Sequence, residues 1–235
     1  MARLRIDPHV HSEDSYDGRE PVELILEHAA DIGLDGVVVT DHDKIGESLR
    51  AAEIASDYGL VGVPGVEVST SHGHLLAIGV DEKPPKRQPF AETVERVREL
   101  GGAAVVPHPF QVTRHGVKKK RIVDCDGVEV YNSWLFTGYR NRKARSFAYR
   151  HGYPRLGGSD AHSITTVGRT YTEVEVDQRG EVSANDIVAA VKNGDTAIHG
   201  KRAPITKSAY HYLKAAARKT GWGLRKTASR LIPVS

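Results

Sequence analysis

Apolar runs and amphipathic stretches alternate along the 235 residues of the chain. The run at 36–40, Gly-Val-Val-Val-Thr, is typical of a strand buried in a parallel sheet. Residues 21–32 have a helical pattern, with Pro21 suited to the first turn and Gly33 to the end. Further strands are expected at 4–6, 61–68, 74–80, 103–106, 128–131 and 154–157, and further helices at 45–58, 90–100 and 139–150. This alternation predicts an α/β fold.

Five short segments, far apart in the chain, are rich in side chains that bind metals. They are Asp7-Pro8-His9-Val10-His11-Ser12, Thr40-Asp41-His42-Asp43, Pro64-Gly65-Val66-Glu67 with His72 and His74 just after, Pro107-His108-Pro109-Phe110, and Gly158-Ser159-Asp160-Ala161-His162. Most of the twelve histidines lie in or near them, whereas histidines placed for packing would scatter without carboxylates beside them. The clustering predicts a metal enzyme.

The positions of these segments favour a closed barrel. Four of the five follow expected strands at their carboxyl ends, which is where barrel enzymes keep their chemistry. Loops that are remote in sequence meet most easily at one site when a parallel sheet closes on itself. An open doubly wound sheet is the alternative, but it would collect ligands mainly at its switch point, which fits fewer segments.

The ligand types indicate more than one metal ion. His9 and His11 are two residues apart, so both imidazoles share one face of an extended strand end. Nitrogen and oxygen ligands without thiolate suit zinc, manganese or iron rather than a cysteine-built structural zinc. The candidate ligands are His9, His11, Asp17, His42, Glu67, His74, His108, Asp160 and His162. One catalytic ion takes about three protein ligands plus water, so two or three ions are expected to share this set.

The ordered motifs Asp-x-His-x-His-Ser, Thr-Asp-His-Asp, Gly-Val-Glu followed by His, Pro-His-Pro and Gly-Ser-Asp-Ala-His resemble those of the PHP family, the polymerase and histidinol phosphatase phosphoesterase domain. The resemblance covers roughly residues 4–200. It implies a distorted, TIM-like barrel of seven β/α units, with two or three metal ions at the carboxyl ends of the strands.

The resemblance also divides the ligands among ions. The implied sets are His9, His11, Glu67 and Asp160 for one ion; Glu67, as a bridge, with His74 and His108 for a second; and Asp17, His42 and His162 for a third. Asp14 lies in the same loop as Asp17 and remains an alternative. His74 is preferred over His72 because it directly precedes the apolar run at 75–78.

Clustered cations favour phosphoester hydrolysis. A water between two of them loses a proton near neutral pH and attacks phosphorus, while the ions orient the phosphate. Asp41, Asp43 and His115 are candidate general acids for protonating the leaving group, and their spacing in the sequence does not select among them.

Basic residues near the motifs are candidates for contacting substrate phosphate: Arg114, Lys118, Arg140 and Arg169. The run at 118–121 is suited to a second phosphate or a nucleic-acid backbone. A solvated loop is the alternative for this run, and surface salt bridges are the alternative for Arg140 and Arg169.

Charge separates the end of the chain from the rest. No acidic residue follows Asp195, but nine basic residues do, which leaves 24 basic against 30 acidic residues in positions 1–195, a formal charge of −6. We expect the PHP barrel at 1–204 and a basic segment at 205–235. Residues Ala209, Tyr212, Leu213 and Ala216 share one helical face, so a helix packed on the barrel is favoured over a nucleic-acid arm.

The composition predicts a cytoplasmic protein with no membrane partner. Cys125 is the only cysteine, so a disulfide framework is excluded. No apolar run typical of a signal peptide follows Met1, and no window approaches the ~18 apolar residues that span a bilayer.

Three functions remain open at this stage. The first is a metal-dependent phosphoesterase acting on nucleotides or the 5′ ends of short DNA or RNA, as a nucleotidase or 5′–3′ exonuclease. The second is a small-metabolite phosphatase of the histidinol phosphate type, and the third is a non-catalytic nucleic-acid-binding barrel. Suitable residues at all nine ligand positions favour an enzyme, and the lack of a large insertion favours nucleotides by family analogy.

Overall fold

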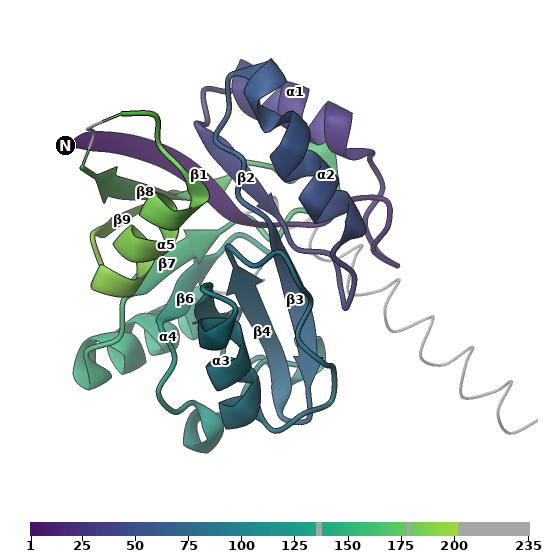
Figure 1. Cartoon of the computed structure of the whole chain (residues 1–235). Coiled ribbons are helices and arrows are strands. Elements are labelled where there is room, and N and C mark those ends of the chain that lie inside the picture. Colours follow the sequence, from purple (N-terminus) through teal and green to yellow (C-terminus); the bar gives the residue numbers. More distant parts are fainter. Residues whose placement is uncertain (135–137, 178–179, 202–235) are drawn as a thin grey trace, which may run out of the picture. The chain divides into compact units, whose positions relative to one another are not determined.

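The computed structural model describes residues 1–134, 138–177 and 180–201, and this part has a mixed α/β fold (Figure 1). Its strands are β1 (Ala2–Val10), β2 (Gly36–Val39), β3 (Gly65–Thr70), β4 (Gly73–Ile78), β5 (Ala103–Val106), β6 (Gly127–Asn132), β7 (Arg155–Gly158), β8 (Thr170–Val176) and β9 (Thr196–Gly200). Its α-helices are α1 (Val22–Asp31), α2 (Gly46–Ile54), α3 (Phe90–Glu99), α4 (Gly138–His151) and α5 (Ala184–Asn193).

The strands form two sheets, with the orders β2-β1-β8-β9 and β3-β4-β5-β6-β7. The expectation of an all-parallel sheet is wrong, because β3–β4, β4–β5, β1–β8 and β8–β9 pair antiparallel. Residues Ser71 and His72 alone connect β3 to β4, and so short a connection makes a hairpin, whereas parallel neighbours need a crossover of a dozen residues or more.

Single bridges join the two sheets where the ligand segments lie. His42, after β2, bridges Glu67 of β3, and Val10 of β1 bridges Ala161, after β7. Continuous pairing around a closed barrel is therefore not seen among the described strands. The bridges nevertheless bring the carboxyl ends of β1, β2 and β7 to the middle of β3.

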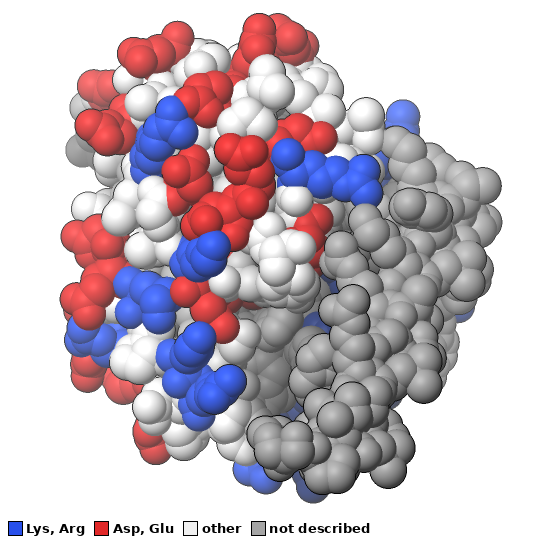
Figure 2. All heavy atoms as spheres, turned by 90° about the vertical axis from the view of Figure 1, so that its right-hand side faces the viewer, with Lys and Arg blue, Asp and Glu red and all other residues white. Residues whose placement is uncertain are grey.

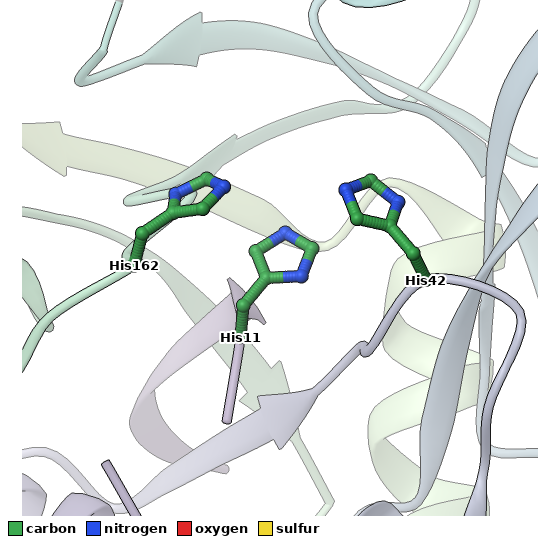
Figure 3. A group of neighbouring side chains, drawn as sticks. All are labelled: His11, His42 and His162. Atoms are coloured by element: carbon green, nitrogen blue, oxygen red, sulfur yellow. The ribbon is translucent and has the colours of Figure 1, made fainter. Parts of the chain in front are cut away.

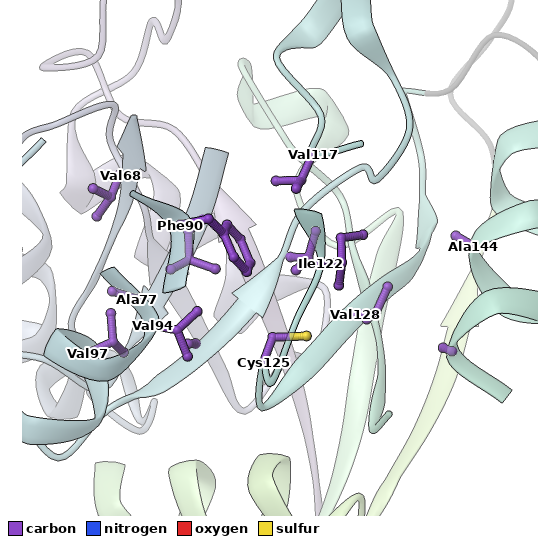
Figure 4. Packing of buried hydrophobic residues seen from close by; sticks show 14 of the residues in the cluster. Val68, Ala77, Phe90, Val94, Val97, Val117, Ile122, Cys125, Val128 and Ala144 are labelled. Atoms are coloured by element: carbon purple, nitrogen blue, oxygen red, sulfur yellow. The ribbon is translucent and has the colours of Figure 1, made fainter. Parts of the chain in front are cut away.

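A buried apolar cluster holds the larger sheet against its helices (Figure 4). Phe90, Val94 and Val97 recur at helical spacing on α3 and are at most 2% exposed. They pack with strand residues such as Ala77 and Val128. Burial of each such side chain contributes roughly 1.5–3 kcal/mol, so the cluster fixes β4 and β5 and the loops that leave them.

The last three elements of the described part were not predicted from the sequence. β8, α5 and β9 follow residue 157, the last position assigned above. Ser183 begins α5 with a capping box, since its side chain accepts from the Asp186 amide while the Asp186 carboxylate accepts from the Ser183 amide. None of the described helices has the length and apolarity needed to cross a membrane. The expected domain boundary at 204 and the expected tail helix lie outside the described residues.

Surface charge is mixed on the face drawn in Figure 2. Lys and Arg alternate with Asp and Glu over the described part of this face, and acidic side chains gather towards its top, the level of α1 and α2 in Figure 1. This part of the surface is not a continuous basic track of the kind that follows a nucleic-acid backbone.

Candidate metal centre

The structure brings all nine predicted ligands into one cluster. Four segments reach it from the carboxyl ends of β1, β2, β5 and β7, while Glu67 and His74 come from the β3–β4 hairpin. His9, Glu67 and Asp160 are at most 1% exposed. Side chains from distant parts of the sequence therefore meet in the interior of the protein.

Four atoms have the spacing of one coordination sphere. His9 Nε2 lies 3.2 Å from His11 Nε2. Glu67 Oε2 lies 3.4 Å from each of these nitrogens, and Asp160 Oδ1 lies 3.5 Å from each. Bonds of about 2.1 Å to a tetrahedral ion place its ligands about 3.4 Å apart. The spacing fits a divalent cation at the centre of the four atoms.

Unsatisfied oxygens support this fit. Glu67 Oε2 and Asp160 Oδ1 are buried, and neither has a hydrogen-bond partner among the described residues. Two buried carboxylate oxygens facing one space are costly when they have lost their hydrogen bonds to water and accept none from the protein. A bound cation would satisfy both oxygens at once.

Glu67 lies between the implied ligand sets. Its Oε1 lies 2.8 Å from His74 Nδ1 and 3.1 Å from His108 Nε2. Its Oε2 lies 3.4 Å from His9 Nε2 and His11 Nε2 and 3.1 Å from His42 Nδ1. The two oxygens thus face different histidines, and a bridge between two ions stays a prediction from the resemblance.

The third implied set meets at Asp17. Its Oδ2 lies 3.0 Å from His162 Nε2 and 3.5 Å from His42 Nε2. Figure 3 shows His11, His42 and His162 converging from three separate segments, and these three also form a group spaced for a metal. His11 therefore lies between the first and third sets.

The two alternatives raised by the sequence lie away from the cluster. Asp14 Oδ1 pairs with Lys44 Nζ at 2.7 Å on the exposed side of the loop. His72 Nδ1 accepts from the Phe90 amide at 3.4 Å.

Electrostatics keeps the carboxylates ionised. Burial opposes the charge of Glu67, but His42, His74 and His9 outweigh it and hold its pKa well below the usual range. Burial likewise opposes the charge of Asp160, and Arg114 with His9 hold its pKa well below normal. Both carboxylates are thus anionic at neutral pH.

Glu129 of β6 contacts the predicted ligands and was not identified in the sequence analysis. Its Oε1 lies 3.1 Å from His9 Nδ1. A carboxylate in this position would accept from a protonated His9 Nδ1 and leave Nε2 as the nitrogen available to a metal. Its Oε2 accepts from the His108 amide at 2.7 Å and from Asn132 Nδ2 at 2.8 Å. A charged residue within the apolar strand sequence Val-Glu-Val was the available signal.

The candidate general acids, Asp41, Asp43 and His115, lie in different environments. Asp41 accepts from Ser12 Oγ at 2.5 Å and from the Ser12 amide at 2.7 Å, and burial raises its pKa. Asp43 and His115 line a cavity of about 690 Å³ whose wall also contains the predicted ligands His42 and His74. Asp43 and His115 therefore face the space next to the cluster.

The candidate phosphate contacts also differ. Arg114 Nη1 lies 2.6 Å from Asp160 Oδ2, so its charge is directed at a predicted metal ligand. Arg140 donates to the Phe110 carbonyl. Lys118 lines the cavity, while Arg169 follows the short helical turn Ile164–Thr166 and is not part of the cavity wall.

Comparisons with known proteins agree with the motifs. The model of a PHP-associated family matches residues 138–196. An uncharacterised protein of Methanocaldococcus jannaschii is 29% identical over 152 residues, 60% of this chain and 89% of that protein. A 3′,5′-nucleoside bisphosphate phosphatase of Chromobacterium violaceum is 33% identical over 107 residues, 42% of this chain and 37% of that protein.

A solved structure has a similar fold. A two-domain protein from Bacteroides vulgatus, described as containing a predicted PHP-like metal-dependent phosphoesterase, matches with a TM-score of 0.70 and 21% identity, over 85% of this chain and 65% of that chain. The chain therefore spans about two fifths of the bisphosphate phosphatase and somewhat under two thirds of the solved protein.

Proposed function

We propose that this chain, which belongs to the PHP-domain family and is a metal-dependent hydrolase, hydrolyses phosphate esters of nucleotides or of the 5′ ends of short DNA or RNA. The observation that carries the proposal is the convergence of His9, His11, Glu67 and Asp160 with two buried oxygens lacking partners. Such a set is built for divalent cations rather than for folding alone.

The nine predicted ligands would hold two or three divalent ions. Bound there, such ions supply Lewis acidity and lower the pKa of water to near neutrality. Glu129 would fix the tautomer of His9, and Arg114 offsets part of the negative charge of Asp160. Asp43 and His115, which line the cavity, would hold or deliver the proton that the leaving alcohol requires.

The proposed substrate class rests on the size of the cavity and on the similarity to one relative. The cavity beside the cluster, about 690 Å³, is within the range of small-molecule sites and suits a nucleotide. The 33% identity to a 3′,5′-nucleoside bisphosphate phosphatase supports the same class. Histidinol phosphate remains the competing substrate.

Two further expectations from the sequence remain proposals. The bridges His42–Glu67 and Val10–Ala161 support an arrangement in which the two sheets are halves of the distorted barrel expected from the family. The cytoplasm remains the compartment that the sequence predicts.

Phosphate release tests the function. We expect Mn²⁺-loaded protein to release phosphate from nucleoside 3′,5′-bisphosphates or 5′-phosphorylated oligonucleotides faster than from histidinol phosphate. Asp160→Ala and Asp160→Asn should both lose turnover and metal, and Asn is tolerated at the positive φ of 54° found here. Asp81→Ala, at an exposed position, is the matched control. Fast release from histidinol phosphate alone would reverse the substrate order, and full activity of Asp160→Asn would refute the site.

A further inference from the structure

Four basic side chains line the cavity beside the metal cluster: Arg87, Lys118, Lys120 and Arg121. None of the four forms an ion pair with another residue in the described part of the chain, although other basic residues such as Arg98 do. All four are exposed. Like charges gathered around one concavity repel each other, so the empty cavity attracts anions.

The two segments that supply the basic side chains, residues 118–121 and Arg87, are held near the β3–β4 hairpin, which carries the predicted ligands Glu67 and His74. The His115 carbonyl accepts from the His74 amide at 2.9 Å, just before the segment at 118–121. On the other side, the Arg87 amide donates to the Ser69 carbonyl at 2.7 Å, and the Ser71 amide donates to the Gln88 carbonyl at 2.9 Å. The β3–β4 hairpin therefore fixes the basic side chains relative to Glu67 and His74.

Little in the cavity offsets this charge. Asp43 is the one acidic residue in its described lining, and its Oδ1 already accepts from the Ser69 amide at 2.8 Å. Tyr16, 70% exposed, stacks on His42 at 4.7 Å between ring centroids. The cavity thus combines a cationic wall, an aromatic ring and two predicted ligands, His42 and His74.

We infer that this cavity binds a second anionic group of the substrate, one that is not hydrolysed, and that the preferred substrates are nucleotide-sized molecules carrying two separate phosphates. The ligand cluster would take one phosphate, and Arg87 with Lys118, Lys120 and Arg121 would take the other. Guanidinium and ammonium groups are the side chains that hold phosphate oxygens. The inference rests on the proposed phosphoesterase function, because that function supplies the first phosphate.

Binding of inert analogues tests the inference. The probes are adenosine analogues in which P–C bonds replace the phosphate ester linkages, one with phosphonates at both 3′ and 5′ and one with a 5′ phosphonate alone. Calorimetry on Mn²⁺-loaded protein should give at least about tenfold tighter binding of the bisphosphonate. The double variant Arg87→Gln/Lys120→Gln should lose this preference and bind the monophosphonate as before. The control Arg150→Gln/Lys192→Gln, at exposed positions outside the cavity lining, should keep it.

The outcomes separate the two proposals. Equal affinity for both probes, no binding of the bisphosphonate, or an unchanged preference in the cavity double variant would each overturn the second-anion site. Absence of phosphate release from every substrate by wild-type protein would instead refute the proposed function. Because the calorimetric preference does not require turnover, it decides the cavity inference in either case.

Discussion

At the scale of single residues, Glu129 links parts of the metal cluster that belong to different segments. One oxygen accepts from His9 Nδ1, and the other accepts from the His108 amide and from Asn132 Nδ2. Asn132 Nδ2 also donates to Asp160 Oδ2 at 2.9 Å. This buried carboxylate thus contacts His9 and His108 directly and Asp160 through Asn132. Residues that hydrogen-bond to metal ligands in this way orient them for binding.

We predict that Glu129→Gln weakens metal binding without unfolding the protein. A neutral amide is a poorer acceptor for His9 Nδ1–H, so Mn²⁺ affinity should fall about 10–100-fold. Metal content after dialysis against defined free Mn²⁺ measures the change. Glu53→Gln, at an exposed position of α2, is the control. If the variant kept wild-type affinity, Glu129 would have only a packing role.

We predict that Cys125 is unreactive in the native protein. Its thiol is buried in the cluster of Figure 4, and burial raises its pKa from 9.0 to about 12. Ellman's reagent at pH 8.5 should label it only after unfolding in guanidinium, because the thiolate is the reacting species. Rapid labelling of folded protein would contradict the burial.

The Cys125 thiol also makes the free energy of unfolding depend on pH. Unfolded protein releases the proton near pH 9, whereas folded protein keeps it to about pH 12. The free energy of unfolding should therefore fall as pH rises between these values, by up to about 1.4 kcal/mol per unit. Cys125→Ala should lack this part of the decline, which urea titrations at pH 8 and 10.5 would detect.

At the scale of elements, the β3–β4 hairpin positions both the cluster and the cavity. Gly73 begins β4 with a φ of +130°, and a Cβ there would lie 2.4 Å from the His115 carbonyl oxygen. The glycine therefore permits the close contact in which the His74 amide donates to His115. This hydrogen bond positions the loop after His115, which supplies the basic residues of the cavity at 118–121.

We predict that Gly73→Ala destabilises the protein by roughly 1–3 kcal/mol, because the backbone strain and the steric overlap act together. Urea unfolding measures the loss. Gly46→Ala is the matched control, since a Cβ there meets nothing within 4 Å at the start of α2; it should be neutral or stabilising by up to about 1 kcal/mol. Equal stability of the two variants would show that the contact at Gly73 is not tight.

Elements with strong periodicity could be predicted from the sequence, and their pairing could not. β2, α1 and α3 lie where apolar runs and helical spacing indicated. The short gap between the expected strands 61–68 and 74–80 indicated the β3–β4 hairpin, but the antiparallel pairs of β8 depend on contacts between distant segments and left no mark in the local pattern. Asp43, His108 and Asp160 have positive φ, a conformation that local propensity disfavours and that only the surrounding fold imposes. The candidate ligands could be identified from the order of the motifs, because metal binding restricts a ligand position to a few residue types.

At the scale of the whole molecule, charge is divided between two parts of the chain. Positions 1–195 have a formal charge of −6, and the nine basic residues that follow reverse it. Residues 202–235 lie outside the described part, so the packed tail helix stays a proposal from sequence. Within the acidic body, the cavity is a local basic region, which directs anions towards the predicted ligands.

We predict that deleting residues 205–235 lowers the melting temperature, because the apolar face of the expected helix needs a core to cover it. Differential scanning calorimetry measures the shift. An unchanged melting temperature combined with weaker, less salt-sensitive oligonucleotide binding would instead support a nucleic-acid arm.

The central claim is that distant histidines and carboxylates share divalent ions. Anomalous diffraction from crystals grown with Mn²⁺ tests it most directly. We expect two or three anomalous peaks, one among His9, His11, Glu67 and Asp160, one beside Glu67 with His74 and His108, and a third beside Asp17 with His42 and His162. Crystals with these side chains ordered and no anomalous peak among them would contradict the account.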